Sequence, residues 1–309
     1  MSKRFFAFGC SYTDYNWATW ADLLCHHFHL EGFEVHNYGN SGMGNQHILD
    51  SLVHADIKHD LTDDDIICVL WSSWAREDRL WNFPANNGRV GFGKCGSVIQ
   101  TDNPQVVNFS DAYFNLEQYI MKSITSIVAA NRAYNIHYQA HITSNEEFND
   151  DHKANGDELL KQFCNFTPEN KFYNRSNSEY TQERKFYYDQ IPLIGRYDGH
   201  PPPGSHLAFV KHQVAPALGI QLRKESIAWM KKEQKEVIHW EQMFDSGMAK
   251  ELYRSELEIN KRKHLTFMKD WRYLWDSEQD GDPIGLNWGH VNNGILNGFK
   301  RAIEKKKLR

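Results

Sequence analysis

Two short segments near opposite ends of the first 220 residues carry residue types that could act together in catalysis. Ser11 lies in the segment FGCSYT, directly after an apolar run, and Asp198 and His200 lie in the segment DGHPPPGSH. A carboxylate can orient an imidazole, and that imidazole can act as base for a serine hydroxyl. The pattern predicts a nucleophile with its base. The alternatives are a helix-capping serine and a proline-rich turn with surface histidines.

The elements that must position these residues alternate between strand and helix patterns. The apolar runs 4–9 and 65–71 are typical of buried strands, and 17–28 has apolar residues at helical spacing. This order predicts an α/β fold with a parallel sheet and helices on both faces. Ser11 would then lie at the carboxyl edge of the sheet, where such proteins bind ligands. Further strands are expected at 34–38 and 136–141, further helices at 46–57, 112–134 and 205–218, a long loop at 82–110, and a helix with irregular segments at 145–195.

Together the two segments resemble the blocks of the SGNH (GDSL-type) serine hydrolases. The segment GCSYT matches the Gly-x-Ser block after the first strand, and Asp198-Gly199-His200-Pro201 matches the Asp-x-His-Pro form of the last block. The resemblance covers roughly residues 3–220 and implies a flavodoxin-like three-layer α/β/α fold with a parallel sheet. It implies Ser11 as nucleophile, His200 as general base and Asp198 as the partner that orients His200.

The blocks of that family that supply the oxyanion hole match less well. Gly42, in the segment NYGNSGMGN after the second strand, matches the glycine whose N–H binds the oxyanion, together with the N–H of Ser11. After the third strand the family has an asparagine, and by count from the strand Ser73 stands in its place. A hydroxyl can donate one hydrogen bond but is shorter than an amide. Arg76 could supply a cationic donor, although a salt bridge with Asp14 or Glu77 is the more common role.

The last 89 residues differ from the rest of the chain. Residues 221–309 contain 18 Lys and Arg against 14 Asp and Glu, a net charge of +4, whereas residues 1–220 have a net charge of −9. The segments 226–244 and 249–275 have helical periodicity. We therefore expect an SGNH-like domain at 1–220 and a mainly helical extension at 221–309 that packs on that domain or makes a homo-oligomer or assembly contact. One stripe of the extension contains Tyr253, Leu257, His264, Met268, Trp271 and Trp275.

Composition excludes several classes of protein. No run of about 18 apolar residues occurs, so no membrane-spanning helix is expected, and the start of the chain does not resemble a secretory signal. The five cysteines include no CxxC pair, which argues against a zinc ribbon or a disulfide framework and favours a reducing, cytoplasmic compartment. The basic residues near the end are interleaved with acids, so nucleic acid is not an expected partner.

Two clusters raise the question of a metal. His26, His27 and His29 lie on one expected helix but lack the glutamate of a HExxH motif. The acidic segment 276–282 resembles the start of a calcium loop, but position 12 is Asn287 rather than glutamate. We expect neither cluster to bind a metal, and the predicted chemistry needs no cofactor.

The sequence thus predicts a serine esterase that cleaves an O-acyl group on a carbohydrate or a small acyl ester. The competing prediction is an SGNH-fold assembly module with weak or no activity. The blocks also resemble divergent SGNH members found in viral and bacterial polysaccharide-related contexts, so a virion component is one form of that alternative. The missing asparagine favours the module, and the intact serine, histidine and aspartate favour the enzyme.

Overall fold

Four parallel strands form the central sheet of the protein. A computed structural model of the 309-residue chain describes residues 3–73, 76, 78, 80–84, 90–94, 115–142, 200–245, 261 and 265. The strands lie in the order β2-β1-β3-β6, which is the start of the 2-1-3-4-5 order of doubly wound proteins. Their bounds are β1 (Arg4–Gly9), β2 (Glu34–Gly39), β3 (Ile66–Trp71) and β6 (Tyr138–His141).

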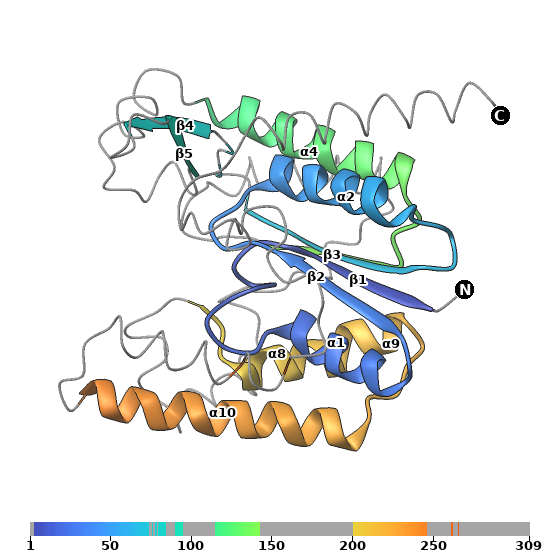
Figure 1. Ribbon diagram of the computed structural model, residues 1–309, viewed down its shortest axis with the longest axis vertical. Helices are drawn as coiled ribbons and strands as arrows, with labels where there is room; N and C mark the ends of the chain where they lie inside the picture. The colour runs from blue at the N-terminus through green and yellow to red at the C-terminus, as the bar shows by residue number, and fades with distance from the viewer. Residues whose placement is uncertain are drawn as a thin grey trace.

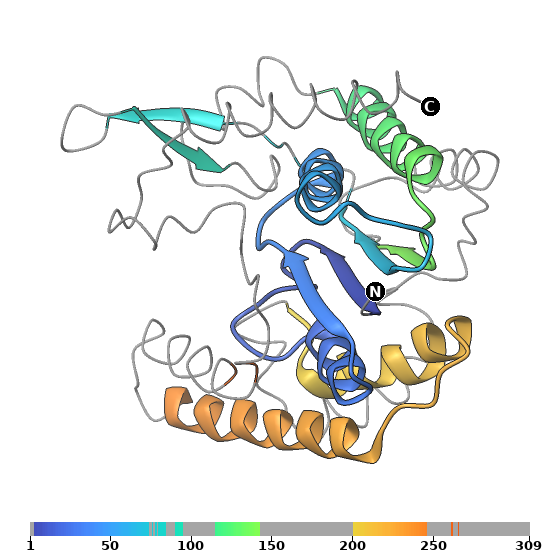
Figure 2. The same ribbon diagram turned by 45° about the vertical axis from the view of Figure 1, so that its right-hand side comes forward.

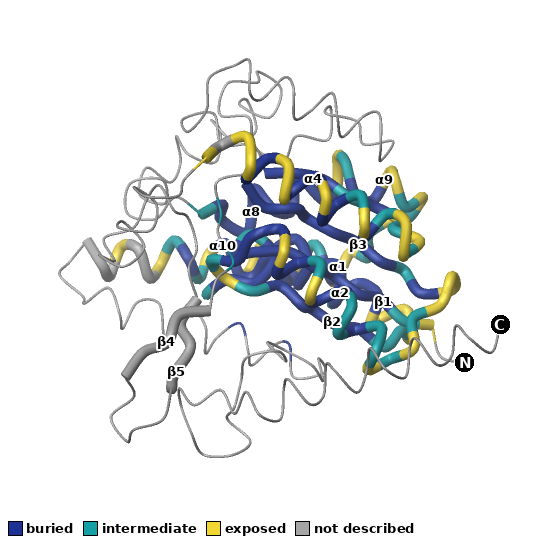
Figure 3. The backbone as a smooth tube through the Cα atoms, turned by 90° about the horizontal axis from the view of Figure 1, so that it is seen from above, coloured by how far each residue is buried: buried dark blue, intermediate teal, exposed yellow. Residues whose placement is uncertain are grey.

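Helices cover both faces of this sheet, so the predicted three-layer α/β class is confirmed (Figure 1). On one face lie α1 (Trp20–Leu30), α8 (Pro203–Phe209) and α10 (Lys224–Asp245); on the other lie α2 (Asn45–His59) and α4 (Leu116–Ala133). The strands separate two buried cores, because side chains of a strand alternate between its faces. Phe5 and Ala7 of β1 belong to the core under α1, and Phe6 and Phe8 to the core under α2. The central strands are buried over most of their length (Figure 3).

The first helix begins three residues later than its apolar spacing predicted. Thr19 is the N-cap of α1, and its side chain and that of Asp22 form a reciprocal capping box. Trp17 therefore precedes the helix, and its ring N–H donates to the carbonyl oxygen of Pro201 at 2.7 Å. The apolar spacing at Trp17 reflects burial in a loop, since only 1% of its surface is exposed.

Two other expectations need correction. The loop expected at 82–110 overlaps an antiparallel hairpin of β4 (Leu80–Pro84) and β5 (Val90–Lys94), which projects away from the central sheet (Figure 2). The helix expected at 205–218 begins earlier, at the start of α8, and continues through a π-helical turn, η2 (Val210–Val214), into α9 (Ala215–Ala217). Pro216, which has no N–H to donate to a carbonyl one turn back, follows that irregular turn.

The described part of the C-terminal region packs on the sheet domain. Helix α10 contacts α1 and α8, and its Trp229 and Met230 belong to the same core as Phe5. Lys261 and Leu265 are also buried. The stripe from Tyr253 to Trp275 lies outside the described residues, and the domain boundary at residue 220 stays a prediction. None of the described helices is both long and apolar enough to span a bilayer.

Candidate active site

Ser11 and His200 lie together at the carboxyl edge of the sheet. The distance from Ser11 Oγ to His200 Nε2 is 2.9 Å, within hydrogen-bond range, although the two residues are 189 positions apart. Ser11 follows β1, which pairs with β2 on one side and β3 on the other. This is where the strand order reverses, the usual place for a ligand in an open α/β sheet. The predicted convergence of these two side chains is therefore observed.

A tight turn after β1 presents Ser11. The backbone N–H groups of Thr13 and Asp14 both donate to Cys10 O, at 2.8 and 3.1 Å. The turn packs closely on β2, because a Cβ atom on Gly39 would lie only 2.7 Å from Asp14 N. Gly39 thus permits an approach that any side chain would prevent. Ser11 itself is buried, with 2% of its surface exposed.

Aromatic residues of the following loop hold His200. The Tyr15 ring stacks on the imidazole with centroids 3.9 Å apart, and the Tyr12 ring lies at 5.6 Å in a tilted arrangement. Trp17 fixes the next residue through its hydrogen bond to Pro201 O. Loop 12–17 therefore contacts the segment that carries the imidazole at several points.

Helix α10 supports the same segment from the other side. Gln234 Oε1 accepts a hydrogen bond of 2.6 Å from Gly204 N, in the first turn of α8. Pro202, the N-cap of α8, has no side-chain capping bond. A glutamine from α10 thus satisfies one of the backbone donors that a helix start leaves open.

Of the remaining predicted residues, Gly42 and Ser73 follow the two strands that neighbour β1. Gly42 follows β2 and has φ of +81°, a conformation that favours glycine. Ser73 lies two residues beyond β3 and is buried. Their oxyanion roles stay predictions, and Asp198, the predicted orienting carboxylate, lies outside the described residues.

An asparagine does reach the end of β3, but from α2. Asn45 Oδ1 accepts from Ser72 N at 2.7 Å, and Asn45 Nδ2 donates to Ser72 O at 3.1 Å. Its amide is thus bound to the backbone beside Ser73. The sequence does not mark Asn45 for this position, because Asn45 lies 27 residues before Ser72 and not directly after the third strand.

Asp78 holds the loop that contains Gly42. Its carboxylate accepts from Gly44 N at 2.6 Å and from His47 N at 3.0 Å, so it caps α2 from outside that helix. Burial raises the pKa of Asp78 to about 6, although these two hydrogen bonds act in the opposite direction. Arg76 donates to Met43 O at 3.2 Å in the same loop.

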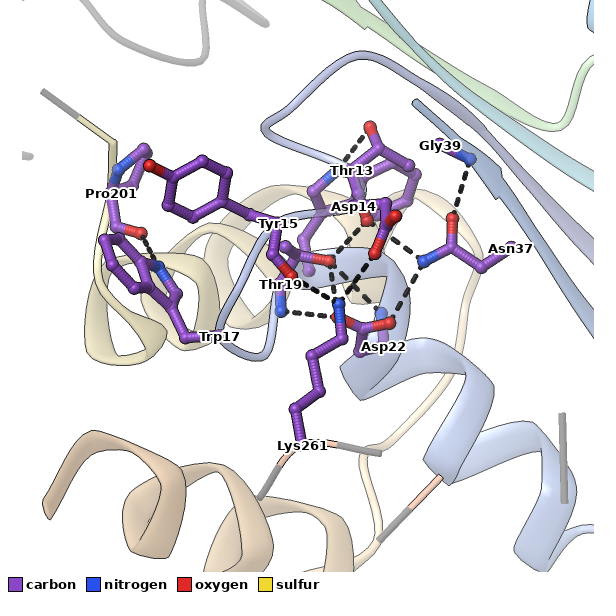
Figure 4. A network of polar contacts seen from close by, with 11 residues as sticks. Thr13, Asp14, Tyr15, Trp17, Thr19, Asp22, Asn37, Gly39, Pro201 and Lys261 are labelled. Carbon is purple, nitrogen blue, oxygen red and sulfur yellow. Dashed lines mark hydrogen bonds and ion pairs between the residues drawn. The ribbon is translucent and has the colours of Figure 1, made fainter. Parts of the chain in front are cut away.

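The salt bridge suggested between Arg76 and Asp14 is wrong. Asp14 instead pairs with Lys261, whose Nζ lies 2.8 Å from Asp14 Oδ1 and 3.0 Å from Asp22 Oδ2 (Figure 4). Glu77, the other suggested partner of Arg76, lies outside the described residues. The three buried side chains of Lys261, Asp14 and Asp22 form what we call the Lys261 cluster.

Asn37 and Thr19 complete the polar surroundings of this cluster. Asn37 Nδ2 donates to Asp22 Oδ1 and to Thr13 O, each at 3.0 Å, and Asn37 Oδ1 accepts from Gly39 N at 2.9 Å. Thr19 N donates to Asp22 Oδ2 at 2.9 Å. Burial raises the pKa of Asp22 above its usual value, although Lys261 lowers it.

His26 of α1 contacts the C-terminal helix α10. His26 Nδ1 lies 2.9 Å from Ser226 Oγ, and its ring stacks on Trp229 with centroids 4.8 Å apart. Within the described ranges no group of three or more His, Cys, Asp or Glu side chains could hold a metal ion. The acidic segment 276–282 lies outside those ranges.

Comparison with known proteins gives no relative. No family model matches the chain, and no curated protein and no solved structure is significantly similar to it.

Proposed function

We propose that this protein is a serine ester hydrolase of the SGNH type. The observation that carries the proposal is the 2.9 Å distance between Ser11 Oγ and His200 Nε2 at the carboxyl edge of a parallel sheet. A serine hydroxyl in contact with an imidazole is the pairing that nucleophilic catalysis requires. The parallel strand order and the motifs around both residues support the family assignment.

In the proposed reaction, Ser11 Oγ attacks the carbonyl carbon of an ester while His200 Nε2 takes the hydroxyl proton. The tetrahedral intermediate collapses, the alcohol leaves with the proton from His200, and an acyl group remains on Ser11. A water molecule, deprotonated by His200, then attacks this acyl-enzyme and releases the acid. Asp198 would accept the Nδ1 proton of His200 as a hydrogen bond and stabilise the imidazolium.

The negative oxygen of the intermediate requires donors about 3 Å away. In our proposal these are the N–H groups of Ser11 and Gly42 with Ser73 Oγ. Support comes from the positions of Gly42 and Ser73 after the strands on either side of β1. The proposed substrates are O-acylated carbohydrates or small acyl esters, and none of these steps requires a cofactor.

The test is labelling of the full-length protein with a fluorophosphonate probe. Attack of Ser11 Oγ on phosphorus would form an O–P bond and expel fluoride, so we expect one adduct on Ser11, located by peptide mass spectrometry. Ser11→Ala should abolish labelling and His200→Gln should lower it by several orders of magnitude, because the residues act as a unit. Ser205→Ala is the matched control, since the buried Ser205 hydroxyl makes no hydrogen bond within the described structure.

The same experiment decides between the esterase and the assembly module, the competing function. A folded wild-type protein that neither labels nor hydrolyses acetylated sugars or nitrophenyl acetate would contradict the enzyme proposal. Labelling that persists in Ser11→Ala would do the same.

A further inference from the structure

Lys261 is a buried cation far from its ionic partners in sequence. None of its surface is exposed, and Asp14, its nearest carboxylate, is 247 positions away. Its ammonium group lies close to three oxygen atoms of the described residues: Asp14 Oδ1 at 2.8 Å, Asp22 Oδ2 at 3.0 Å and Tyr15 O at 2.8 Å. An ammonium group has three N–H donors, so these oxygens can engage all of them (Figure 4).

Such an arrangement tolerates little displacement. Burial lowers the pKa of Lys261, but the carboxylates of Asp14 and Asp22 outweigh it and raise the pKa above its usual value, which keeps the group charged. Removing one partner of a buried ion pair leaves an uncompensated charge in a low-dielectric site. The cluster thus fixes the backbone at Tyr15 as well as the two carboxylates.

The same stretch of backbone holds the candidate base. Asp14 and Tyr15 follow Ser11 by three and four residues, and the Tyr15 ring lies against His200 at 3.9 Å. Trp17 packs edge-on against Tyr15, with centroids 4.6 Å apart, and bonds to Pro201 O. Tyr15 thus contacts Lys261 through its carbonyl oxygen and His200 through its ring, so it links the C-terminal region to the imidazole.

We propose that Lys261 is a positioning residue of the active site: through Asp14 and Tyr15 O it holds loop 12–17 so that Tyr15 keeps His200 against Ser11. The proposal rests on the proposed esterase function. It assigns a residue of the C-terminal region to the catalytic geometry without giving that region a nucleophile, base or acid.

The test compares Lys261→Met with Lys231→Met, the same substitution at an exposed lysine of α10. Two quantities are measured on folded full-length protein: the rate of fluorophosphonate labelling and the NMR shift of the His200 Cε1 proton, assigned with His200→Gln. A displacement of the base by about 1 Å can cost about a hundredfold in rate. We expect a labelling loss of about ten- to a hundredfold in Lys261→Met, and a His200 resonance that moves away from its ring-current-shifted position. Lys231→Met should match wild type in both.

A second variant protects the test against misfolding. Asp14→Asn combined with Lys261→Met removes one charge of each sign, so the cluster keeps its net charge of one negative unit. The double variant should be more stable than Lys261→Met. It should still label more slowly than wild type and show the displaced His200 resonance, because Tyr15 O still lacks its donor.

Either folded variant with wild-type labelling and an unchanged His200 resonance would overturn the proposal. So would failure of both variants to fold, which would make Lys261 a folding determinant only. If wild-type protein does not label at all, the esterase proposal fails, and the His200 resonance still decides whether Lys261 positions the imidazole.

Discussion

The phenol ring of Tyr15 lies almost parallel to the imidazole of His200, with planes inclined by 17° and centroids 3.9 Å apart. The orientation of the candidate base is therefore set by packing as well as by any carboxylate on its Nδ1. Because Tyr15 is only four residues from Ser11, one loop carries the candidate nucleophile and contacts the candidate base. In the proposed reaction, this geometry would supply part of the rate enhancement before any proton moves.

The stack predicts unequal effects for two substitutions of Tyr15. Tyr15→Phe retains a flat ring and should keep labelling of Ser11 within about threefold of wild type, whereas Tyr15→Leu should slow it by about ten- to a hundredfold. Both are measured as second-order labelling rates. Equal rates for Leu and Phe would show that the stack does not position His200.

Much of the fold follows from local sequence. The strand at Arg4–Gly9 has the predicted bounds, and β3 differs by one residue from the expectation of 65–71. Both strands were predictable because a continuous apolar run between turns is typical of a buried parallel strand. The hairpin β4–β5 was missed since it lies in a glycine-rich stretch that also fits a loop. Helix starts depended on capping, and the Thr19–Asp22 capping box was a local signal that the apolar spacing obscured.

The site was only partly predictable. Ser11 and His200 stand in motifs with a recognisable chemical logic, but Lys261 stands among interleaved charges that resemble a solvated helix face. Nothing local distinguishes a lysine that will be buried against two aspartates more than 200 residues away, because that environment is created only by the tertiary fold. Asn37 and Asn45 were missed for the same reason: their amides bind backbone groups of other segments.

Asp78 provides a test of how the Gly42 loop is held. Asp78→Ala leaves Gly44 N and His47 N without their acceptor, and loss of a helix cap costs about 1–2 kcal/mol of unfolding free energy. Asp78→Asn has a side chain of similar shape that keeps one acceptor oxygen, so its free energy of unfolding should fall by less. Urea unfolding at pH 7 measures both. A stability of Asp78→Ala equal to wild type would show that these hydrogen bonds contribute nothing net.

Glu233 on α10 should make stability depend on pH. Burial, with a smaller contribution from Asp22, raises the pKa of Glu233 from 4.5 to about 7. A pKa raised by folding means that this group favours the folded state fully below pH 4.5 and loses that contribution as pH rises through 7. The glutamine of Glu233→Gln stays neutral at every pH. Relative to wild type, the free energy of unfolding of this variant should therefore increase by on the order of 3 kcal/mol between pH 4.5 and 8.

Urea unfolding of wild type and Glu233→Gln at pH 5 and pH 8 measures this difference. The pH 5 comparison serves as the internal reference: the folded-state Glu233 is mostly neutral there, and only a small part of the expected destabilisation has developed. A stability difference between the two proteins that is the same at both pH values would contradict the prediction.

Gly42 and Gly32 offer a matched pair for the oxyanion proposal. Their φ angles are +81° and +84°, and a Cβ atom on either would meet nothing within 4 Å. Substitution by alanine should therefore lower the free energy of unfolding equally at both positions, by about 1–2 kcal/mol, because the left-handed conformation strains a residue with a Cβ atom. Gly32 follows α1 at the turn into β2, at the end of that strand opposite to Gly42.

If Gly42 N–H binds the oxyanion, Gly42→Ala should slow ester hydrolysis by about ten- to a hundredfold through loss of donor geometry, and Gly32→Ala should leave it unchanged. The measurements are kcat/KM for a nitrophenyl ester and the urea midpoint of each variant. Equal stability losses with equal hydrolysis rates would remove Gly42 from the proposed oxyanion hole.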